Sequence, residues 1–534
     1  MYDVLIRKGR VIDGTGNPWF KADVGVEKGR IAAVDNLASE SADTIIDAKD
    51  MVICPGFIDI HSHSDFTLLM NPLAESKIRQ GVTTEVIGNC GLSAAPLNDP
   101  LKEDILKTMP LLEEAKLELT WSTMGQYINL MQEKGVALNV TPLVGNSNIR
   151  VSVLGFENRH PTEDELEEMK KILAQAMKDG AFGMSTGLIY PPSCYANTDE
   201  LVELAEVVAR FGGIYTSHIR GEGFMLINAV KEAIKIGERA KVPVEVSHHK
   251  ASGRPNWGKV KQTLQMMEEA RDRGIDITCD VYPYIAGSTG LDALLPPTAY
   301  EGGVEKLVER LRDPVTRRKI KEQMIRTGEE GGPETLGVPE WGKIQISYCK
   351  GQPNLEGKTI KYIAKEKGID PFNFVFDLLI EEKASVSIVL FTMREEDMHH
   401  VLSNHLSMVG SDSSARAPYG VLGKGKPHPR TYGTFPRILG RYVREKGILA
   451  LGNAVRKMTS LPAQKLKLKD RGLIREGMWA DVVAMDPKRV IDQATYREPH
   501  QYPEGVEYVL VNGKLVIEHS KHTKALPGHV LRMR

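Results

Sequence analysis

Histidine, cysteine and aspartate side chains recur along this sequence at the ends of short apolar runs. The first are His61 and His63, whose spacing of two puts both imidazoles on one face of an extended segment. Imidazole, thiolate and carboxylate groups bind zinc, and a catalytic zinc keeps one position open for water. A single histidine is more often a hydrogen-bonded structural residue, but the recurrence predicts a metal site. The other members are Cys90, His218, His248 beside His249, and Asp412.

The runs that carry these residues predict a parallel barrel of the α/β class. Eight apolar strands alternate with helical patterns, which is typical of βα units. The strands are predicted to end near His61, Cys90, Gly145, Thr186, His218, His248, Tyr282 and Asp412. The helical patterns include residues 164–179, 199–210, 225–240 and 259–273. Eight units predict a (β/α)8 barrel of the TIM type, in which catalytic groups lie at the carboxyl ends of the strands.

Both ends of the chain are rich in strand-forming residues, and Asn512-Gly513 between two such runs is a hairpin signal. Neither end is long enough for a core of its own. We therefore predict one small β-sandwich from residues 1–57 and 472–534, with the barrel at 58–471. Residues 286–350 are too long for a plain βα loop and are rich in Gly, Pro and charge, so we expect an insertion that could act as a lid.

The overall composition excludes some classes of partner. The net charge of −1 over 534 residues provides no broad basic field for nucleic acid or an anionic membrane. Five scattered cysteines do not suggest a disulfide framework and favour a reducing cytoplasm. The N-terminus lacks the pattern of a signal peptide, and no apolar run approaches the ~18 residues of a membrane span. We expect a cytoplasmic protein that acts on a small molecule.

Longer motifs carry a family resemblance. The runs Pro55–His63 and Gly472–Val483 resemble the amidohydrolase superfamily, and five further motifs more narrowly resemble the D-aminoacylases (N-acyl-D-amino-acid deacylases). These are IGNCG at 87–91, SHIR at 217–220, SHHK at 247–250, GSD at 410–412 and HPRTYGTFPR at 428–437. The resemblance spans nearly the whole chain. It implies a barrel, a β-sandwich built from both termini, and a segment inserted before the eighth strand.

The resemblance also implies a set of metal ligands. Many dinuclear members of the superfamily bridge two metals with a carboxylated lysine on the fourth strand, but residues 181–188 contain no lysine. The D-aminoacylases instead use a second-strand cysteine, which matches Cys90. Cys90, His218 and His248 would then hold a tightly bound Zn²⁺. His61 and His63 would line a second, weaker site.

His248 and His249 compete for one ligand position. Adjacent residues of a strand face opposite ways, so only one of the two can look into the barrel. The family spacing from His218 favours His248, and we expect His249 to pack outward or to support the ligands.

Asp412 is the candidate catalytic carboxylate. The alternative is a turn or N-cap aspartate, because Ser-Asp-Ser-Ser suits a turn, but a position on the eighth strand opposite the zinc favours catalysis. Zinc would polarise the amide carbonyl and lower the pKa of bound water. Asp412 would accept the proton of that water and return it to the amine nitrogen, which is otherwise a poor leaving group.

The α-carboxylate of an N-acyl amino acid requires a cation and hydroxyl donors. Lys250 lies two residues beyond His248 on the same strand face. Residues 286–299 contain no Lys or Arg and are rather apolar, which favours apolar D-amino acids, although the D configuration itself follows from the resemblance alone. The resemblance supports Lys250, Tyr190, Tyr282 and Ser288 as carboxylate or acyl contacts, and the His-Pro-Arg motif adds Arg430.

Zinc-dependent hydrolysis of N-acyl-D-amino acids to a carboxylate and a free D-amino acid is therefore the predicted function. A cyclic-amide hydrolase of the hydantoinase or dihydroorotase type is the nearest rival, and Cys90 with the missing fourth-strand lysine speaks against it. A non-catalytic scaffold of the same fold is the second rival. Such scaffolds usually lose histidines or the eighth-strand aspartate, and all of these are present here.

Overall fold

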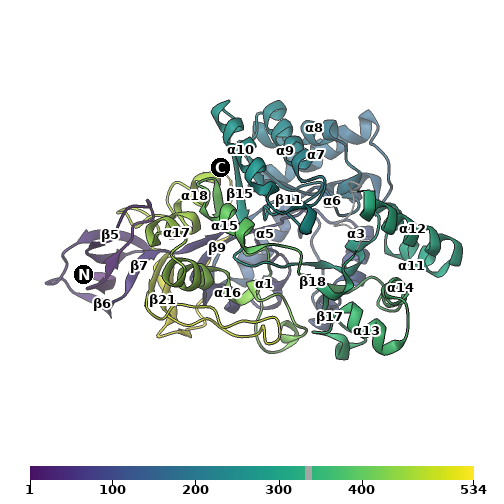
Figure 1. Cartoon of the computed structure of the whole chain (residues 1–534). Helices are drawn as coiled ribbons and strands as arrows, with labels where there is room; N and C mark the ends of the chain where they lie inside the picture. The colour runs from purple at the N-terminus through teal and green to yellow at the C-terminus, as the bar shows by residue number, and fades with distance from the viewer. Residues whose placement is uncertain (331–338, 534) are drawn as a thin grey trace.

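Eight short parallel strands form a barrel at the centre of the computed structural model, which describes residues 1–330 and 339–533 (Figure 1). All of their residues are buried, which explains why the sequence shows continuous apolar runs rather than alternation. The strands are β8 (Phe57–Asp59), β9 (Val82–Ile87), β10 (Asn139–Pro142) continued by β11 (Val144–Gly145), β12 (Gly183–Gly187), β13 (Ile214–His218), β14 (Val244–Val246), β15 (Ile277–Val281) and β19 (Ser407–Val409).

Pairing between neighbouring strands closes the ring. Parallel ladders join β8 to β9 and β9 to β10, and a second series runs from β11 through β15 to β19. The chain passes from β10 directly into β11. Between β19 and β8, a parallel bridge joins Ser62 to Ser413, and the Asp412 N–H donates to the carbonyl of His61 at 2.8 Å. The predicted (β/α)8 barrel is confirmed.

Helices cover the outside of the barrel (Figure 1). Four of them begin and end within one residue of the predicted ranges: α7 (Glu163–Asp179), α8 (Thr198–Arg210), α9 (Leu226–Ala240) and α10 (Lys259–Asp272). Sequence signals fix their ends. Thr162 and Glu165 form a capping box before α7, and Gly180 ends this helix with a φ of 119°, a left-handed value that glycine adopts without strain.

The two ends of the chain meet in a β-sandwich. Strand β7 (Val52–Pro55) pairs antiparallel with β20 (Val482–Met485), and the same seven-stranded sheet continues through β21 (Val506–Val511) and β22 (Lys514–Glu518). A four-stranded sheet shares an apolar core with it; its order is β5 (Arg30–Asp35), β4 (Asp23–Glu27), β1 (Tyr2–Arg7), β6 (Ala42–Asp47). The small β-sandwich predicted from both termini is confirmed. Asn512 and Gly513 both have positive φ in the turn between β21 and β22, as the hairpin signal requires.

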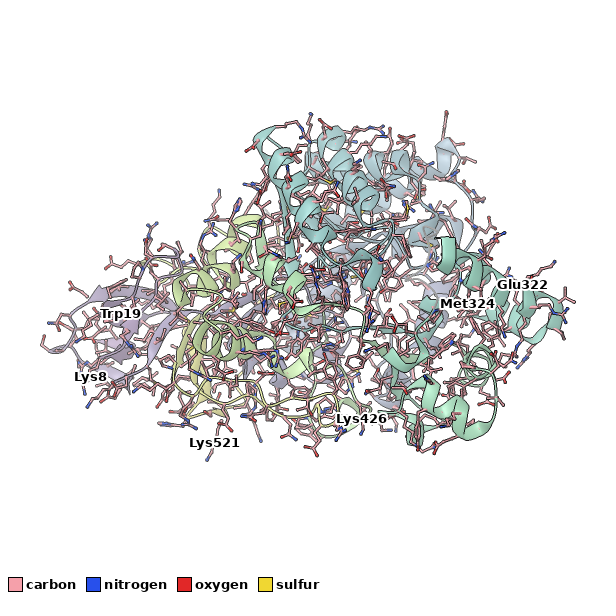
Figure 2. The ribbon with its side chains drawn as sticks, viewed as in Figure 1. Lys8, Trp19, Glu322, Met324, Lys426 and Lys521 are labelled. Atoms are coloured by element: carbon pink, nitrogen blue, oxygen red, sulfur yellow. The ribbon has the colours of Figure 1, made fainter. Side chains whose placement is uncertain are left out.

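Between β15 and β19 the chain makes a long excursion with its own apolar core. Its antiparallel sheet has the order β16 (Gly287–Gly290), β18 (Val386–Leu390), β17 (Ile344–Cys349). The insertion expected at residues 286–350 forms only part of this excursion, because β18 completes the sheet. Helices α11 (Val304–Arg312), α12 (Pro314–Glu330), α13 (Ile360–Lys367) and α14 (Pro371–Glu381) surround it. Glu322 and Met324 belong to this excursion. They lie at the opposite end of the molecule from Lys8 and Trp19, which belong to the sandwich (Figure 2).

Candidate metal centre and substrate cavity

Side chains from the ends of five barrel strands converge into two groups of possible metal ligands that share Cys90. In the first, ligand atoms of Cys90, His218 and His248 all lie within 4.8 Å of one another; in the second, those of Cys90, His61, His63 and Asp412 do. The Cys90 Sγ is 3.3 Å from Nε2 of His61 and 3.4 Å from Nε2 of His248. The structure thus brings together every ligand that the sequence predicted.

The backbone is strained at three of these residues. Cys90, His248 and Asp412 have φ values of 53°, 35° and 49°, a left-handed conformation that costs on the order of 1–3 kcal/mol for a residue other than glycine. Each lies where a strand turns into its following loop. The surrounding fold therefore holds these side chains at some cost in stability, which is common at functional sites.

The donor set fits a zinc ion. His218 is 4% exposed, and neither of its ring nitrogens has a hydrogen-bond partner among the described residues. An unpaired buried imidazole nitrogen is costly unless an ion or ligand satisfies it. One thiolate and two imidazoles are a typical zinc set that leaves a fourth position open.

The charges around Cys90 favour its ligand form. Burial opposes a thiolate, but the neighbouring His61 and His248 outweigh it and hold the pKa of Cys90 well below its usual value. Cationic neighbours usually lower the pKa of a cysteine in this way, so that it becomes a thiolate at neutral pH.

Asp412 lies between the metal ligands and a cation. Its Oδ1 is 3.0 Å from Nε2 of His63, and its Oδ2 is 2.7 Å from Nη1 of Arg430. Burial alone would raise the pKa of this carboxyl, but Arg430, followed by His248, lowers it well below the usual value. Asp412 is therefore a carboxylate at neutral pH, able to accept a proton.

Two carboxylates that the sequence did not predict, the fully buried Asp280 and the half-buried Glu222, orient the histidines. Oδ2 of Asp280 is 3.1 Å from Nδ1 of His61, and Oε1 of Glu222 is 2.9 Å from Nδ1 of His248. Glu222 also pairs with the ammonium of Lys250. Such partners fix the ring orientation of a ligand and make it more basic. A sequence signal existed for Asp280, since it is a carboxylate inside the apolar strand ITCDVY; the loop residue Glu222 had none.

A second buried polar cluster lies behind the site. Lys77 is fully buried, and its Nζ is 2.8 Å from Oδ2 of Asp59 and 3.0 Å from Oε1 of Glu85. Asp59 also accepts from the Ser411 N–H at 2.8 Å. Because Asp59 and Ser411 adjoin the strand ends that carry His61 and Asp412, this cluster fixes the first strand against the eighth.

We expect Glu222→Gln to weaken metal binding. The amide keeps the shape of the side chain but loses the charge that faces His248 and Lys250, and changes of this kind reduce metal affinity by about 10- to 100-fold. Competition between the protein and a chromophoric zinc chelator would measure the change. An unaltered zinc affinity would show that Glu222 does not support the ligand His248.

The five predicted substrate contacts line one cavity of about 1170 Å³ together with most of the ligands. Two cations lie over the ring of Tyr282: its centroid is 4.6 Å from Cζ of Arg430 and 5.7 Å from Nζ of Lys250. The Tyr190 hydroxyl is 3.0 Å from Oγ1 of Thr289. Ser288 lies at the start of the excursion and donates to the carbonyl of Ile388 at 2.9 Å.

His249 faces away from the cavity. Its Nε2 lies 2.8 Å from the hydroxyl of Thr263 on helix α10. The structure thus turns His248 toward the ligands and His249 toward the surrounding helices, although both residues lie beyond the end of β14 rather than on the strand. Every helix in the described ranges is too short or too polar to cross a membrane.

Comparison with known proteins places the chain among metal-dependent hydrolases. The model of the amidohydrolase family matches residues 44–517. A D-aminoacylase from Alcaligenes xylosoxydans xylosoxydans is 35% identical over 533 residues, which are 99% of this chain and 97% of the relative. The crystal structure of an N-acyl-D-glutamate deacylase from Bordetella bronchiseptica, complexed with zinc and a phosphonate mimic of the tetrahedral intermediate, superposes with a TM-score of 0.84. It is 33% identical, and the match covers 99% of both chains.

The rival cyclic-amide hydrolases are more distant. A D-hydantoinase structure superposes with a TM-score of 0.55 at 15% identity, covering 100% of this chain and 99% of the other. Similarity at this level shows a shared fold and carries no argument about the substrate.

Proposed function

The chain belongs to the amidohydrolase family, and from that premise we propose that it hydrolyses the amide bond of N-acyl-D-amino acids. One observation carries the proposal: a single cavity joins a thiolate–imidazole ligand set, the carboxylate Asp412, and cations suited to an α-carboxylate. The D configuration is proposed from the relatives, whose names specify D-amino acids.

Cys90, His218 and His248 would hold Zn²⁺, and His61 with His63 would line a second position beside Asp412. Zn²⁺ bound there supplies a Lewis acid for the amide carbonyl and lowers the pKa of water. The zinc in the complex of the Bordetella deacylase supports the choice of metal.

Asp412 moves the proton. Its carboxylate accepts a proton from the attacking water as the carbon–oxygen bond forms, and then donates it to the amide nitrogen as the carbon–nitrogen bond breaks. His63 and Arg430 hold the two oxygens of this carboxylate and so fix its direction. The products are a carboxylate and a free amino acid.

Lys250, Arg430 and the hydroxyls of Tyr282, Ser288 and Tyr190 would hold the substrate. Arg430 lines the cavity, and its guanidinium carries the positive charge that an α-carboxylate requires. A charged group held in this way positions the scissile carbonyl, which is a large part of catalysis.

We further propose apolar D-amino acids as the preferred products. Residues 286–299 begin the excursion and contribute Ser288, Thr289, Ala293, Leu294 and Pro297 to the cavity wall, but no Lys or Arg. An acidic substrate side chain would find no partner in this segment.

The five scattered cysteines support a cytoplasmic location.

N-acetyl-D-methionine and its L enantiomer, assayed side by side for release of methionine, test the proposal. We expect hydrolysis of the D form and a rate at least ~10²-fold lower for the L form, because an inverted centre moves the carbonyl when the carboxylate is held. Equal rates would overturn the proposed specificity. Hydrolysis of hydantoin without hydrolysis of either enantiomer would favour a cyclic-amide hydrolase. The absence of any activity in the presence of zinc would favour a non-catalytic scaffold.

A further inference from the structure

The cavity is larger than an N-acetyl amino acid requires, and apolar side chains from several loops line part of it. Resting on the function proposed above, we propose that this part is a subsite for a medium-length apolar acyl chain. The proposed carboxylate contacts Lys250, Tyr282 and Arg430 line one part of the same cavity. The proposed subsite, called here the acyl arm, is lined by Phe66, Leu92, Leu101, Met109, Val151, Phe156 and Leu188.

The order of strands around the barrel sets the direction of the chain. Lys250, Tyr282 and Arg430 follow the sixth, seventh and eighth strands, β14, β15 and β19. The acyl arm is built largely from segments that follow the second, third and fourth strands, β9, β10 with β11, and β12. In a ring of eight these two sets lie on opposite sides of the barrel mouth. With the α-carboxylate on the first side and the scissile carbonyl at the ligands, the acyl group points toward the second.

The wall of the acyl arm leaves apolar surface uncovered. Leu92 is 39% exposed, and Met109 and Phe156 are half-buried although both pack against the main core. Beneath them Leu101, Val151 and Leu188 are almost fully buried and complete the surface. Apolar side chains that stay partly exposed inside a cavity are typical of a binding surface for an apolar ligand.

Three of the polar residues that line this part of the cavity are compatible with such a ligand. Asn158 and His160 are exposed, so they face solvent at the edge of the cavity. Asp104 is half-buried, and burial, together with the nearby Asp292, raises its pKa to about 7. A carboxyl with this pKa is largely neutral at slightly acid pH, where an apolar chain beside it meets no full charge.

The size of the cavity agrees with this occupant. Pockets for drug-sized ligands measure roughly 300–1,000 Å³, and this cavity has about 1170 Å³. An acetyl group ends one carbon beyond the scissile carbonyl and leaves the acyl arm empty. Each further methylene that the arm buries is expected to improve binding by up to about fourfold.

A series of N-acetyl-, N-hexanoyl- and N-decanoyl-D-methionine tests the inference with the full-length zinc-loaded protein. We expect kcat/KM to rise by at least ~10-fold from acetyl to hexanoyl, since part of the four added methylenes is buried. Efficient cleavage of the acetyl substrate with flat or falling values for longer chains would overturn the acyl arm and leave the proposed function intact. Failure to cleave any member would instead contradict the function itself.

Phe156→Asp and Phe211→Asp make a matched pair for the location of the subsite. Both phenylalanines are half-buried against the main core, but only Phe156 is among the residues that line the cavity. We expect Phe156→Asp to lower the ratio of hexanoyl to acetyl kcat/KM by at least fivefold and Phe211→Asp to leave this ratio unchanged, with thermal melting as a check on folding. An equal ratio in both variants would place the acyl chain elsewhere.

Discussion

Replacement of Asp412 by asparagine is expected to lower kcat for N-acetyl-D-methionine by about 10²- to 10⁴-fold, the range in which general acid–base groups contribute. The amide keeps the size of the side chain and can still contact His63, but it cannot accept and return a proton. KM should change much less, because Lys250 and the hydroxyl donors remain. Steady-state kinetics together with zinc content by mass spectrometry would measure both effects.

The loss of charge also leaves Arg430 without its carboxylate partner, so the variant must be distinguished from a merely destabilised protein. Asp481→Asn is a matched control. Asp481 is 4% exposed, pairs with Arg471 and lies in the sandwich, far along the chain from any ligand. Breaking a buried ion pair costs about 3–5 kcal/mol, so both variants should melt earlier. Only Asp412→Asn should lose kcat, and a full rate in that variant would exclude Asp412 as the base.

The barrel and the ligands could be predicted from the sequence because both leave local signals. Strands buried on both faces appear as apolar runs, and ligand-type residues stand at the ends of five of these runs. Cys90, His218, His248 and Asp412 were found in this way, and the structure places them together. The β-sandwich, which is confirmed, could be predicted because both ends of the chain are rich in strand-forming residues and each is too short for a core of its own.

The supporting contacts depend on segments far apart in the chain, and the sequence analysis did not find them. Glu222 reaches His248 from the loop after β13, and Arg430 reaches Asp412 from beyond the eighth strand. No periodicity encodes such contacts. Asp59, Glu85, Glu245 and Asp280 did leave a signal, since each is a lone acid in an apolar strand, and all are fully buried. Lone acids of this kind predict a polar layer inside the barrel.

Cys90→Ala is expected to abolish zinc binding and activity together. Cys90 is the one residue common to both ligand groups found among the described residues. Its removal leaves only His218 and His248 in the first ligand group. It also removes the thiolate from the second group, which keeps His61, His63 and Asp412. We expect less than ~0.1 equivalent of zinc after dialysis and a loss of kcat/KM of at least ~10³-fold, since loss of the Lewis acid and of the activated water removes several kcal/mol of transition-state stabilisation.

His63→Ala provides the comparison that assigns the working metal. His63 belongs only to the group that contains Asp412, so Cys90, His218 and His248 remain intact in this variant. We expect it to keep about one zinc and an activity within ~10-fold of the parent, the loss arising from the missing contact to Oδ1 of Asp412. If His63→Ala lost zinc and activity as fully as Cys90→Ala, catalysis would require both positions. The two groups around the shared thiolate would then form a single dinuclear centre.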